Sequence, residues 1–238
     1  MSIGRELFLL SKRIGYEFSD TQLLQTALTH SSYANEMRGK GTLFPSNERL
    51  EFLGDAVLEV VISKFLYDNY KSSSEGALTK MRQYLVCEKT LAKIAAEIEL
   101  GEYIHLGKGE ELTDCRKRPK VLADAMEAII GAMYLDSRER GDERYAEIIL
   151  TLFKGEIEAA AAMQKGDCKT LLQELVETDG SAILEYEVVE ESGPDHNKTF
   201  TVIAKVNNNI FGKGTGKSKK AAEMDAARAA LAIFGVDI

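Results

Sequence analysis

Hydrophobic residues recur at helical spacing along most of the first 160 positions of the chain. The apolar side chains come three or four residues apart, so that each run would form one face of an amphipathic helix. The clearest runs lie at residues 23–28, 50–61 and 91–98. Clusters rich in glycine, serine or proline separate the runs, at residues 38–46, 71–74 and 101–119. The pattern therefore predicts an all-helical N-terminal domain, which we place at residues 1–160.

The pattern changes to strand spacing in the last third of the chain. Apolar and polar side chains alternate there, as in a sheet with one buried face, and turn residues such as Gly193 and Pro194 separate the alternating runs. The predicted elements are a helix at 169–176, strands at 183–190, at 200–206 and from 210, and a helix at 218–234. This order predicts an α-β-β-β-α domain over residues 167–236, joined to the first domain by a linker at 161–166. The expected fold class is thus multidomain, α followed by α+β.

Composition and charge narrow the class of protein. The chain has 238 residues, and 38 Asp and Glu against 30 Lys and Arg give a formal net charge of −8. That balance argues against a protein that binds nucleic acid over its whole surface. Hydrophobic residues at 45% exclude a long disordered chain, and no run approaches the ~18 apolar residues of a membrane span. The three cysteines, Cys87, Cys115 and Cys168, have no paired spacing, which favours a reducing, cytoplasmic compartment.

An acidic stripe marks the predicted helix at 47–63. At 100° per residue, its acidic side chains fall within an arc of about 80°. They are Glu48, Glu51, Asp55 and Glu59, and the apolar residues Leu50, Leu53, Val57, Val60 and Val61 lie on the opposite side. Most charge stripes are solvated helix faces. Like charges one turn apart are nevertheless destabilising, and a divalent cation would relieve the repulsion, so both interpretations stay open at this point.

A second acidic pair, Asp124 and Glu127, lies in a stretch that otherwise holds small or apolar residues. The two side chains would be about 60° apart on a helix. Carboxylates in so apolar a helix are costly to bury unless they are paired or bind a metal. If the two acidic helices pack together, four carboxylates could converge on Mg²⁺ or Mn²⁺.

The acidic motif, NERLEFLGDAVL at residues 47–58, resembles the signature of the ribonuclease III family. Three further blocks resemble that family in order and spacing, at residues 26–33, 75–82 and 122–128. The resemblance implies an all-helical endonuclease domain that forms a homodimer and depends on Mg²⁺, which Mn²⁺ can replace. Hydrolysis would then need no serine, cysteine or histidine nucleophile, and His30 is expected to be structural.

The resemblance also implies roles for individual acidic residues. The metal ligands would be Glu51, Asp55, Asp124 and Glu127. Among them, Asp55 and Glu127 occupy the positions that the family needs for chemistry. Glu48 and Glu75 would serve substrate or secondary metal contacts, whereas Glu59 is not part of the family pattern. Glu75 has another interpretation, because an acid in the first turn after a capping Ser74 complements the helix dipole.

The C-terminal domain resembles a double-stranded RNA-binding domain, with its lysine-rich run GKGTGKSKKAA at residues 212–222. Cations are disfavoured at a helix start, and a bound phosphate would reverse that penalty. The run is not a nucleotide-binding P-loop, because Phe211 stands where the first glycine is required, so no nucleotide cofactor is expected. By resemblance, the RNA contacts would be Thr170, Gln173, Glu174, His196, Asn197, Lys198, Lys217, Ser218, Lys219 and Lys220.

Together these features predict a homodimeric, Mg²⁺-dependent endoribonuclease that cleaves double-stranded RNA. Its products would carry 5′-phosphate and 3′-hydroxyl ends, and its substrates would be ribosomal RNA precursors and messenger RNA. The main alternative is a non-catalytic double-stranded RNA-binding protein on the same scaffold. A helical interaction protein with an incidental acidic stripe would leave Asp124, Glu127 and the lysine run unexplained.

Overall fold

The computed structural model divides the chain into two compact units, Met1–Glu158 and Ala159–Ile238. It describes residues 3–71, 73–165, 168–177, 182–194 and 198–236. The first unit is entirely helical apart from its connections, and the second holds a small sheet with helices. Both units have the predicted fold class, so the change of pattern near residue 183 correctly signalled a change of architecture.

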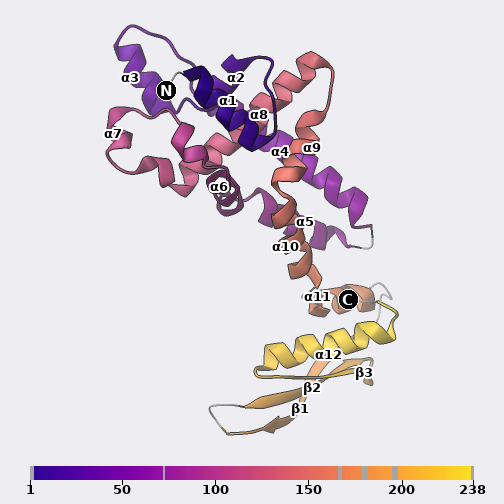
Figure 1. The fold of residues 1–238 in the computed structure, drawn as a ribbon. Coiled ribbons are helices and arrows are strands. Elements are labelled where there is room, and N and C mark those ends of the chain that lie inside the picture. Colours follow the sequence, from indigo (N-terminus) through magenta and orange to yellow (C-terminus); the bar gives the residue numbers. More distant parts are fainter. Residues whose placement is uncertain (1–2, 72, 166–167, 178–181, 195–197, 237–238) are drawn as a thin grey trace. The chain divides into compact units, whose positions relative to one another are not determined.

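The helical unit is built around two long helices, α4 (Glu48–Asn69) and α8 (Pro119–Arg140), which lie side by side (Figure 1). The other helices are α1 (Ile3–Ile14), α2 (Thr21–Ala27), α3 (Ser31–Gly39), α5 (Glu75–Val86), α6 (Glu88–Glu97), α7 (Lys108–Glu111) and α9 (Arg144–Leu152), with the 3₁₀ turns η1 (Leu100–Tyr103) and η2 (Cys115–Lys117). Helix α10 (Lys154–Lys165) begins in this unit and continues past its end at Glu158. The core of the unit lies around α8, which is buried at Ala125, Ile129 and Met133.

Two glycines allow α4 and α8 to pack backbone against backbone. A Cβ atom at Gly54 would lie 1.8 Å from the carbonyl oxygen of Glu127, and one at Gly131 would lie 2.4 Å from that of Leu50. Both distances are far below van der Waals contact, so no larger residue fits at either position. A glycine inside a helix costs about 1 kcal/mol of helix propensity relative to alanine. Here the close approach of the two helices accounts for it.

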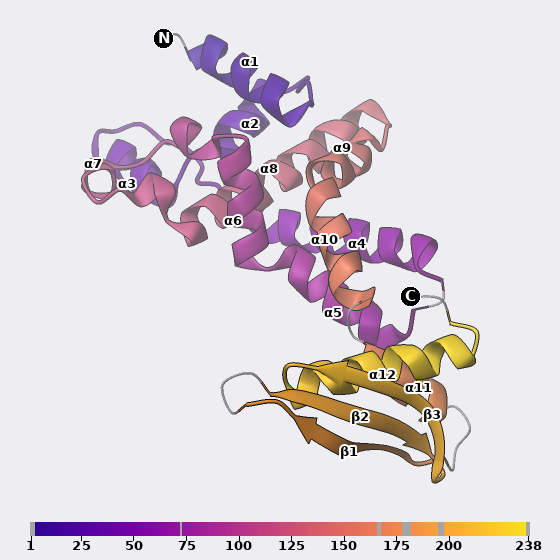
Figure 2. The ribbon, with the colours of Figure 1, turned by 60° about the horizontal axis from the view of Figure 1, so that its bottom comes forward.

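The second unit holds a three-stranded antiparallel sheet in the order β1-β2-β3. Its elements are α11 (Cys168–Glu177), β1 (Leu184–Ser192), β2 (Thr199–Val206), β3 (Asn209–Gly216) and α12 (Lys219–Ile233). Both helices lie on one face of the sheet (Figure 2), over a core that includes Leu172, Val202 and Ala226. A Cβ atom at Gly212 or Gly214 would lie 2.0 Å from backbone atoms of Ala226. The alternating glycines of β3 therefore bring α12 directly onto the strand.

The structure refines several expected boundaries. Helix α10 runs to Lys165, so residues 161–165 of the expected linker are helical. Strand β1 extends to Ser192, and a register shift between Val188 and Glu190 marks a bulge in it. None of the helices in the described residues has the length and apolarity needed to span a bilayer.

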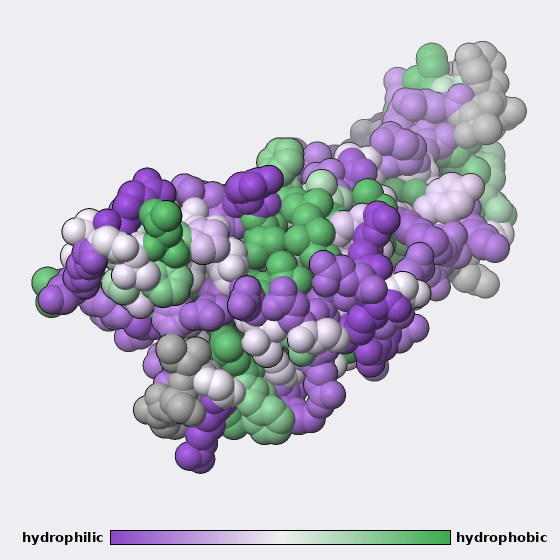
Figure 3. Space-filling model, turned by 90° about the horizontal axis from the view of Figure 1, so that it is seen from above, coloured by the Kyte–Doolittle hydropathy of each residue, from purple (hydrophilic) through white to green (hydrophobic). Residues whose placement is uncertain are grey.

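One prediction for α4 was wrong. Val60 was expected on the buried side, but its side chain is 67% exposed. With Phe52 at 81% and Tyr67 at 74%, it forms an exposed apolar stripe along α4. Figure 3 shows a hydrophobic patch among hydrophilic residues on the face of the molecule that is seen from above. Single exposed apolar residues are normal, but a row of three on one helix suggests an interaction surface.

Candidate metal centre and RNA interface

Three carboxylates converge where α4 and α8 make their closest contact. Glu51 comes from α4, and Asp124 and Glu127 come from α8. One carboxylate oxygen from each residue lies within 4.8 Å of one carboxylate oxygen from each of the other two. All three side chains are partly buried. Gly54 and Gly131 create this cluster, because only their close packing brings the two acidic helix faces together.

Burial and mutual repulsion disfavour the ionised form of the carboxyl groups in this cluster. Burial is the main cause that raises the pKa of Glu127 to about 7, and the charges of Asp55, Glu51 and Asp124 raise it further. The pKa of Glu51 is also raised, by burial first and then by Asp124. Hard divalent cations bind to several carboxylate oxygens at once, so these residues fit such an ion. A cation here would remove the repulsion that now favours protonation.

One basic side chain faces the cluster. The ammonium group of Lys120 lies 3.2 Å from each carboxylate oxygen of Asp124. This contact is the main reason that the pKa of Lys120 is raised, and the lysine charge also opposes the shifts at Glu51 and Glu127. Lys120 was not among the predicted site residues, because a basic residue next to acidic ones is common on any helix surface.

Three of the predicted acidic residues lie outside this cluster of three. Asp55 is exposed, although its charge reaches Glu127. Glu48 is also exposed and accepts a hydrogen bond of 2.7 Å from the Ser46 hydroxyl group. Glu75 begins α5 and accepts a hydrogen bond of 2.8 Å from Thr79.

The position of Glu75 supports its structural interpretation, without excluding a role in substrate binding. Ser74 caps α5 through a hydrogen bond from the Ala77 amide, so Glu75 complements the helix dipole. Its side chain lines a cavity of about 250 Å³ between α4 and α5, together with Tyr67 and Arg82. Glu75 is therefore placed at a second location, apart from the three converging carboxylates.

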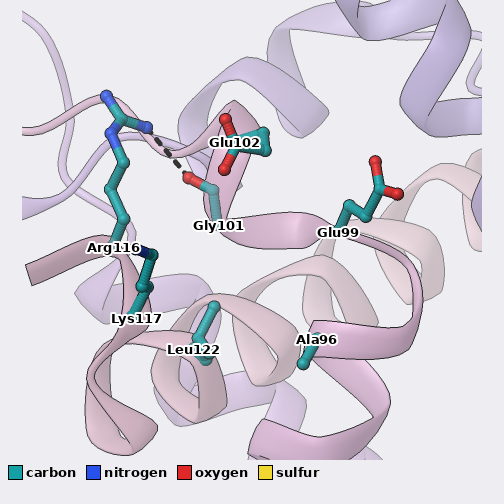
Figure 4. Close-up of a pocket in the computed structure, with 7 residues that line it drawn as sticks. All are labelled: Ala96, Glu99, Gly101, Glu102, Arg116, Lys117 and Leu122. Carbon is teal, nitrogen blue, oxygen red and sulfur yellow. Dashed lines mark hydrogen bonds between the residues drawn. The ribbon is translucent and has the colours of Figure 1, made fainter. Parts of the chain in front are cut away.

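A larger cavity, of about 570 Å³, lies beside the start of α8 and holds none of the predicted catalytic residues. Its lining includes Gly101, Arg116 and Lys117, drawn in Figure 4. Arg116 donates hydrogen bonds to the carbonyl oxygens of Gly101, at 2.9 Å, and Ile104, at 2.7 Å. It also pairs with Glu111. These contacts fix the segment that leads into α8, and so they help to position the acidic residues of its first turns.

The lysine-rich run lies at the start of α12, as its sequence predicted. Lys217, Lys219 and Lys220 are exposed there, and Ser218 caps the helix by accepting a hydrogen bond from the Ala221 amide. Lys219 is 3.2 Å from Glu191 of β1, so part of its charge is already balanced. The structure thus places the lysines together on an accessible helix start, where a phosphate would find both charge and amide donors.

The other predicted RNA contacts are only partly covered by the described residues. On α11, Thr170 and Glu174 are half-buried, and the exposed Gln173 bonds Glu177. Lys198 precedes β2 and is half-buried. His196 and Asn197 lie outside the described residues.

Comparison with known proteins decides the family. Residues 20–154 match the family described as ribonuclease-III-like, and residues 168–233 match the double-stranded RNA binding motif. The chain belongs to the ribonuclease III family. Its helical unit contains the nuclease domain of that family and its second unit contains the double-stranded RNA-binding domain, so the protein is an endoribonuclease.

Relatives in the ribonuclease III family match nearly the whole chain. Ribonuclease 3 of Caldanaerobacter subterraneus subsp. tengcongensis is 48% identical over 231 residues, which are 97% of this chain and 99% of the relative. Ribonuclease 3 of Bacillus licheniformis is 48% identical over 93% of this chain and 87% of its own length. A solved nuclease domain of ribonuclease III from Campylobacter jejuni is 39% identical, with a TM-score of 0.55, and covers 62% of this chain and 96% of that domain.

Membership of the ribonuclease III family makes the nuclease domain metal-dependent, in agreement with the cluster of Glu51, Asp124 and Glu127. Sequence reasoning missed Gly54 and Gly131, on which this cluster depends. A signal was present, because each glycine interrupts a strongly helical apolar run, Gly54 directly before Asp55 and Gly131 four residues after Glu127. A helix interior rarely keeps such a residue without a packing reason.

Proposed function

We propose that the protein is a homodimeric, Mg²⁺-dependent endoribonuclease that hydrolyses double-stranded RNA to 5′-phosphate and 3′-hydroxyl ends. It processes ribosomal RNA precursors and messenger RNA in the cytoplasm. Residues 1–160 form the domain that cleaves RNA, and residues 167–236 form the domain that binds it. The observation that carries the proposal is the convergence of Glu51, Asp124 and Glu127 within 4.8 Å.

In this proposal Glu51, Asp55, Asp124 and Glu127 hold Mg²⁺, and Mn²⁺ can replace it. A cation held by these residues would supply an activated water, by lowering its pKa, and would stabilise the charge that develops on the phosphate oxygens. Asp55 acts from the exposed side of the cluster, where solvent and substrate have access. Glu48 and Glu75 make substrate or secondary metal contacts from their exposed positions.

The second domain holds the RNA duplex. The minor grooves are contacted by Thr170, Gln173 and Glu174 of α11. They are also contacted by His196, Asn197 and Lys198, which precede β2 in the sequence. The start of α12, at Lys217, Ser218, Lys219 and Lys220, spans the phosphates between them. The exposure of these lysines at a helix N-terminus supports this assignment, because lysine charge and free amide donors both favour phosphate.

The homodimer uses the apolar stripe of Phe52, Val60 and Tyr67 on α4. Three large apolar side chains, each at least 67% exposed, are costly to leave in water, and a second copy of the stripe would cover them. The stripe lies on the same helix as Glu51, so the two active sites of a dimer would lie close to the shared interface. Replacement of Phe52 by aspartate should give monomers in sedimentation experiments. Phe8→Asp, at an exposed residue of α1, should leave the dimer intact.

The activity is tested on a long RNA duplex with the full chain. We expect cleavage in Mg²⁺, none in EDTA, and at least a 1,000-fold loss in Glu127→Gln, a level of loss typical when an essential catalytic group is removed. Glu59→Gln is the matched control, because Glu59 is exposed on α4 outside the cluster. Cleavage that survives EDTA would contradict the metal mechanism. Duplex binding without cleavage by the unaltered chain would favour the non-catalytic alternative.

A further inference from the structure

Lys120 and Asp124 form an ion pair at the edge of the acidic cluster. The lysine nitrogen is 3.2 Å from both carboxylate oxygens of Asp124. The lysine side chain is 72% exposed, whereas that of Asp124 is 22% exposed. The ammonium group therefore lies on the solvent side of the cluster, on a flexible stem that can turn away from the aspartate.

Helix stability does not account for a lysine at this position. Lys120 lies in the first turn of α8, where the helix dipole disfavours a cation. The pair also has its basic residue one turn before its acidic residue, which is the weaker order for an ion pair on a helix. Exposed pairs of this kind contribute little to folding. Helix stability therefore gives no reason for Lys120, and its contact with the acidic cluster is the feature that remains to be explained.

Lys120 and a divalent cation would compete for the same atoms. A hard cation at Glu51, Asp124 and Glu127 binds through carboxylate oxygens, and the ammonium group contacts both oxygens of Asp124. The ammonium group would also be repelled by a dication a few ångströms away. Once displaced, it would remain beside the cluster with three hydrogen-bond donors and a full positive charge.

We propose that Lys120 is a counter-ion of Asp124 before metal loading and a contact to the RNA phosphate after it. This inference rests on the proposed metal-dependent cleavage and adds a residue to it. Lys120 first screens the crowded carboxylates. When the site is loaded, its ammonium group turns outward and binds a non-bridging oxygen of the phosphate that approaches the cluster.

The first arm of the test measures Mn²⁺ binding by calorimetry without RNA, on the full chain. Lys120→Met keeps the stem and removes the charge, so Mn²⁺ affinity should rise by about three- to tenfold. Lys120→Arg should bind Mn²⁺ like the unaltered chain. Lys117→Met is the matched control and should leave Mn²⁺ affinity unchanged. The Lys117 side chain is 78% exposed, and its ion pair with Asp114 is long, at 3.9 Å.

The second arm measures RNA cleavage at saturating Mg²⁺. Lys120→Met should lose about tenfold in kcat/KM, and its salt slope should fall by about one, as for one lost phosphate contact. Lys120→Arg keeps the positive charge, so it should retain most of the kcat/KM and of the salt slope of the unaltered chain.

The outcomes test the role of Lys120 separately from the proposed metal site. Unchanged or weaker Mn²⁺ binding in Lys120→Met would overturn the counter-ion role, and tighter binding with undiminished cleavage would overturn the phosphate contact. If the unaltered chain binds no Mn²⁺, or Asp124→Asn binds it equally well, the proposed metal site itself fails.

Discussion

The carboxyl group of Glu127 is half-buried among other acidic side chains, and this makes its ionisation costly in the metal-free protein. Its pKa is raised from 4.5 to about 7, mainly by burial. Glu127 therefore imposes no penalty on the folded state below about pH 4.5, and its penalty grows as the pH rises from 4.5 to about 7. Glu127, which we propose as a metal ligand, thus weakens the metal-free fold at neutral pH, which is a usual cost of a functional site.

Glu127→Gln should remove that cost while it abolishes cleavage. In EDTA at pH 8, we expect the variant to be more stable than the unaltered chain by about 1 to 2 kcal/mol, after allowance for solvent screening at a half-exposed site. The midpoint of thermal unfolding would rise by about 4 °C. The difference should vanish near pH 4.5, where the glutamate is protonated too. Equal stability at pH 8 would show that ionised Glu127 does not destabilise the folded protein, either through burial or through repulsion by its acidic neighbours.

Glu156 should show the opposite dependence on pH. This buried carboxylate accepts hydrogen bonds from Lys93 and, at 2.7 Å, from Tyr84, and its pKa is lowered by these two partners. Its stabilisation is present above about pH 4.5 and is lost as the pH falls through the lowered pKa. Glu156→Gln should therefore cost about 1 to 2 kcal/mol at pH 7 and little at pH 3, measured by urea unfolding. A constant cost at both pH values would contradict the ionic contribution.

Helical periodicity predicted which acidic residues share a helix face, but not that the two acidic helices would pack together or which of those residues would lie in the cluster. The acidic faces around Glu51 and Asp124 converge. Asp55 is only about 40° from Glu51 around α4, and periodicity gives no measure of its depth in the protein. Its exposure depends on where α8 crosses α4, and a single sequence does not encode that crossing in any local pattern. Val60 was misplaced for a related reason, since periodicity alone gives no sign of a second apolar face on α4.

At the scale of elements, the α4–α8 contact controls both the fold and the site. Gly54→Ala would place a Cβ atom 1.8 Å from the Glu127 carbonyl oxygen, so the helices must separate. We expect a loss of about 3 kcal/mol in unfolding free energy, as for an overpacked core, and loss of Mn²⁺ binding in calorimetry. Gly155→Ala on α10 is the matched control. No heavy atom lies within 4 Å of its added Cβ, so it should stabilise by about 0.5 to 1 kcal/mol.

In the second unit, the contact between β3 and α12 also depends on glycines, as the α4–α8 contact does in the first. Gly214→Ala would put a Cβ atom 2.0 Å from the Ala226 nitrogen, so α12 could not remain on the strand. We expect loss of duplex RNA binding in filter assays, while the helical unit keeps its own unfolding transition. Thr215→Ala, on the exposed side of the same strand, should bind RNA normally. Normal binding by Gly214→Ala would show that the glycines do not serve packing.

The element order was predictable because both units follow simple periodic patterns, whereas the glycine contacts had to be seen in three dimensions. In the run at 212–216 the glycines alternate with Lys213 and Thr215, which is strand spacing. The same residues also resemble a phosphate-binding loop, but Phe211 stands where the first glycine of that motif is required, so the resemblance fails. Ala226, which Gly212 and Gly214 approach, is 14 and 12 residues away from them in sequence, and no local pattern predicts that contact.

At the scale of the whole molecule, a net charge of −8 coexists with RNA binding because the charges are segregated. Residues 167–238 hold 12 acidic and 8 basic residues, yet residues 196–222 hold six lysines and no acid. The structure reduces this local excess, because Lys205 pairs with Glu187 and Lys219 pairs with Glu191. The basic surface is therefore smaller than the sequence alone suggested, and RNA affinity should depend on few phosphate contacts.

This limited surface predicts a shallow salt dependence. With contacts from Lys198, Lys217, Lys219 and Lys220, the logarithm of duplex affinity should fall with the logarithm of salt concentration at a slope of about −3 to −4 per bound protomer. Filter binding of the full chain in EDTA, between 50 and 200 mM salt, would measure it without cleavage. Lys219→Met should reduce the slope by about one. Lys205→Met should not change it, since Lys205 pairs with Ile210 at the end of β2 remote from the start of α12, and its side chain is only 25% exposed. A slope near −8 would require phosphate contacts far beyond these lysines, and the RNA interface would then have to extend over surfaces outside the start of α12.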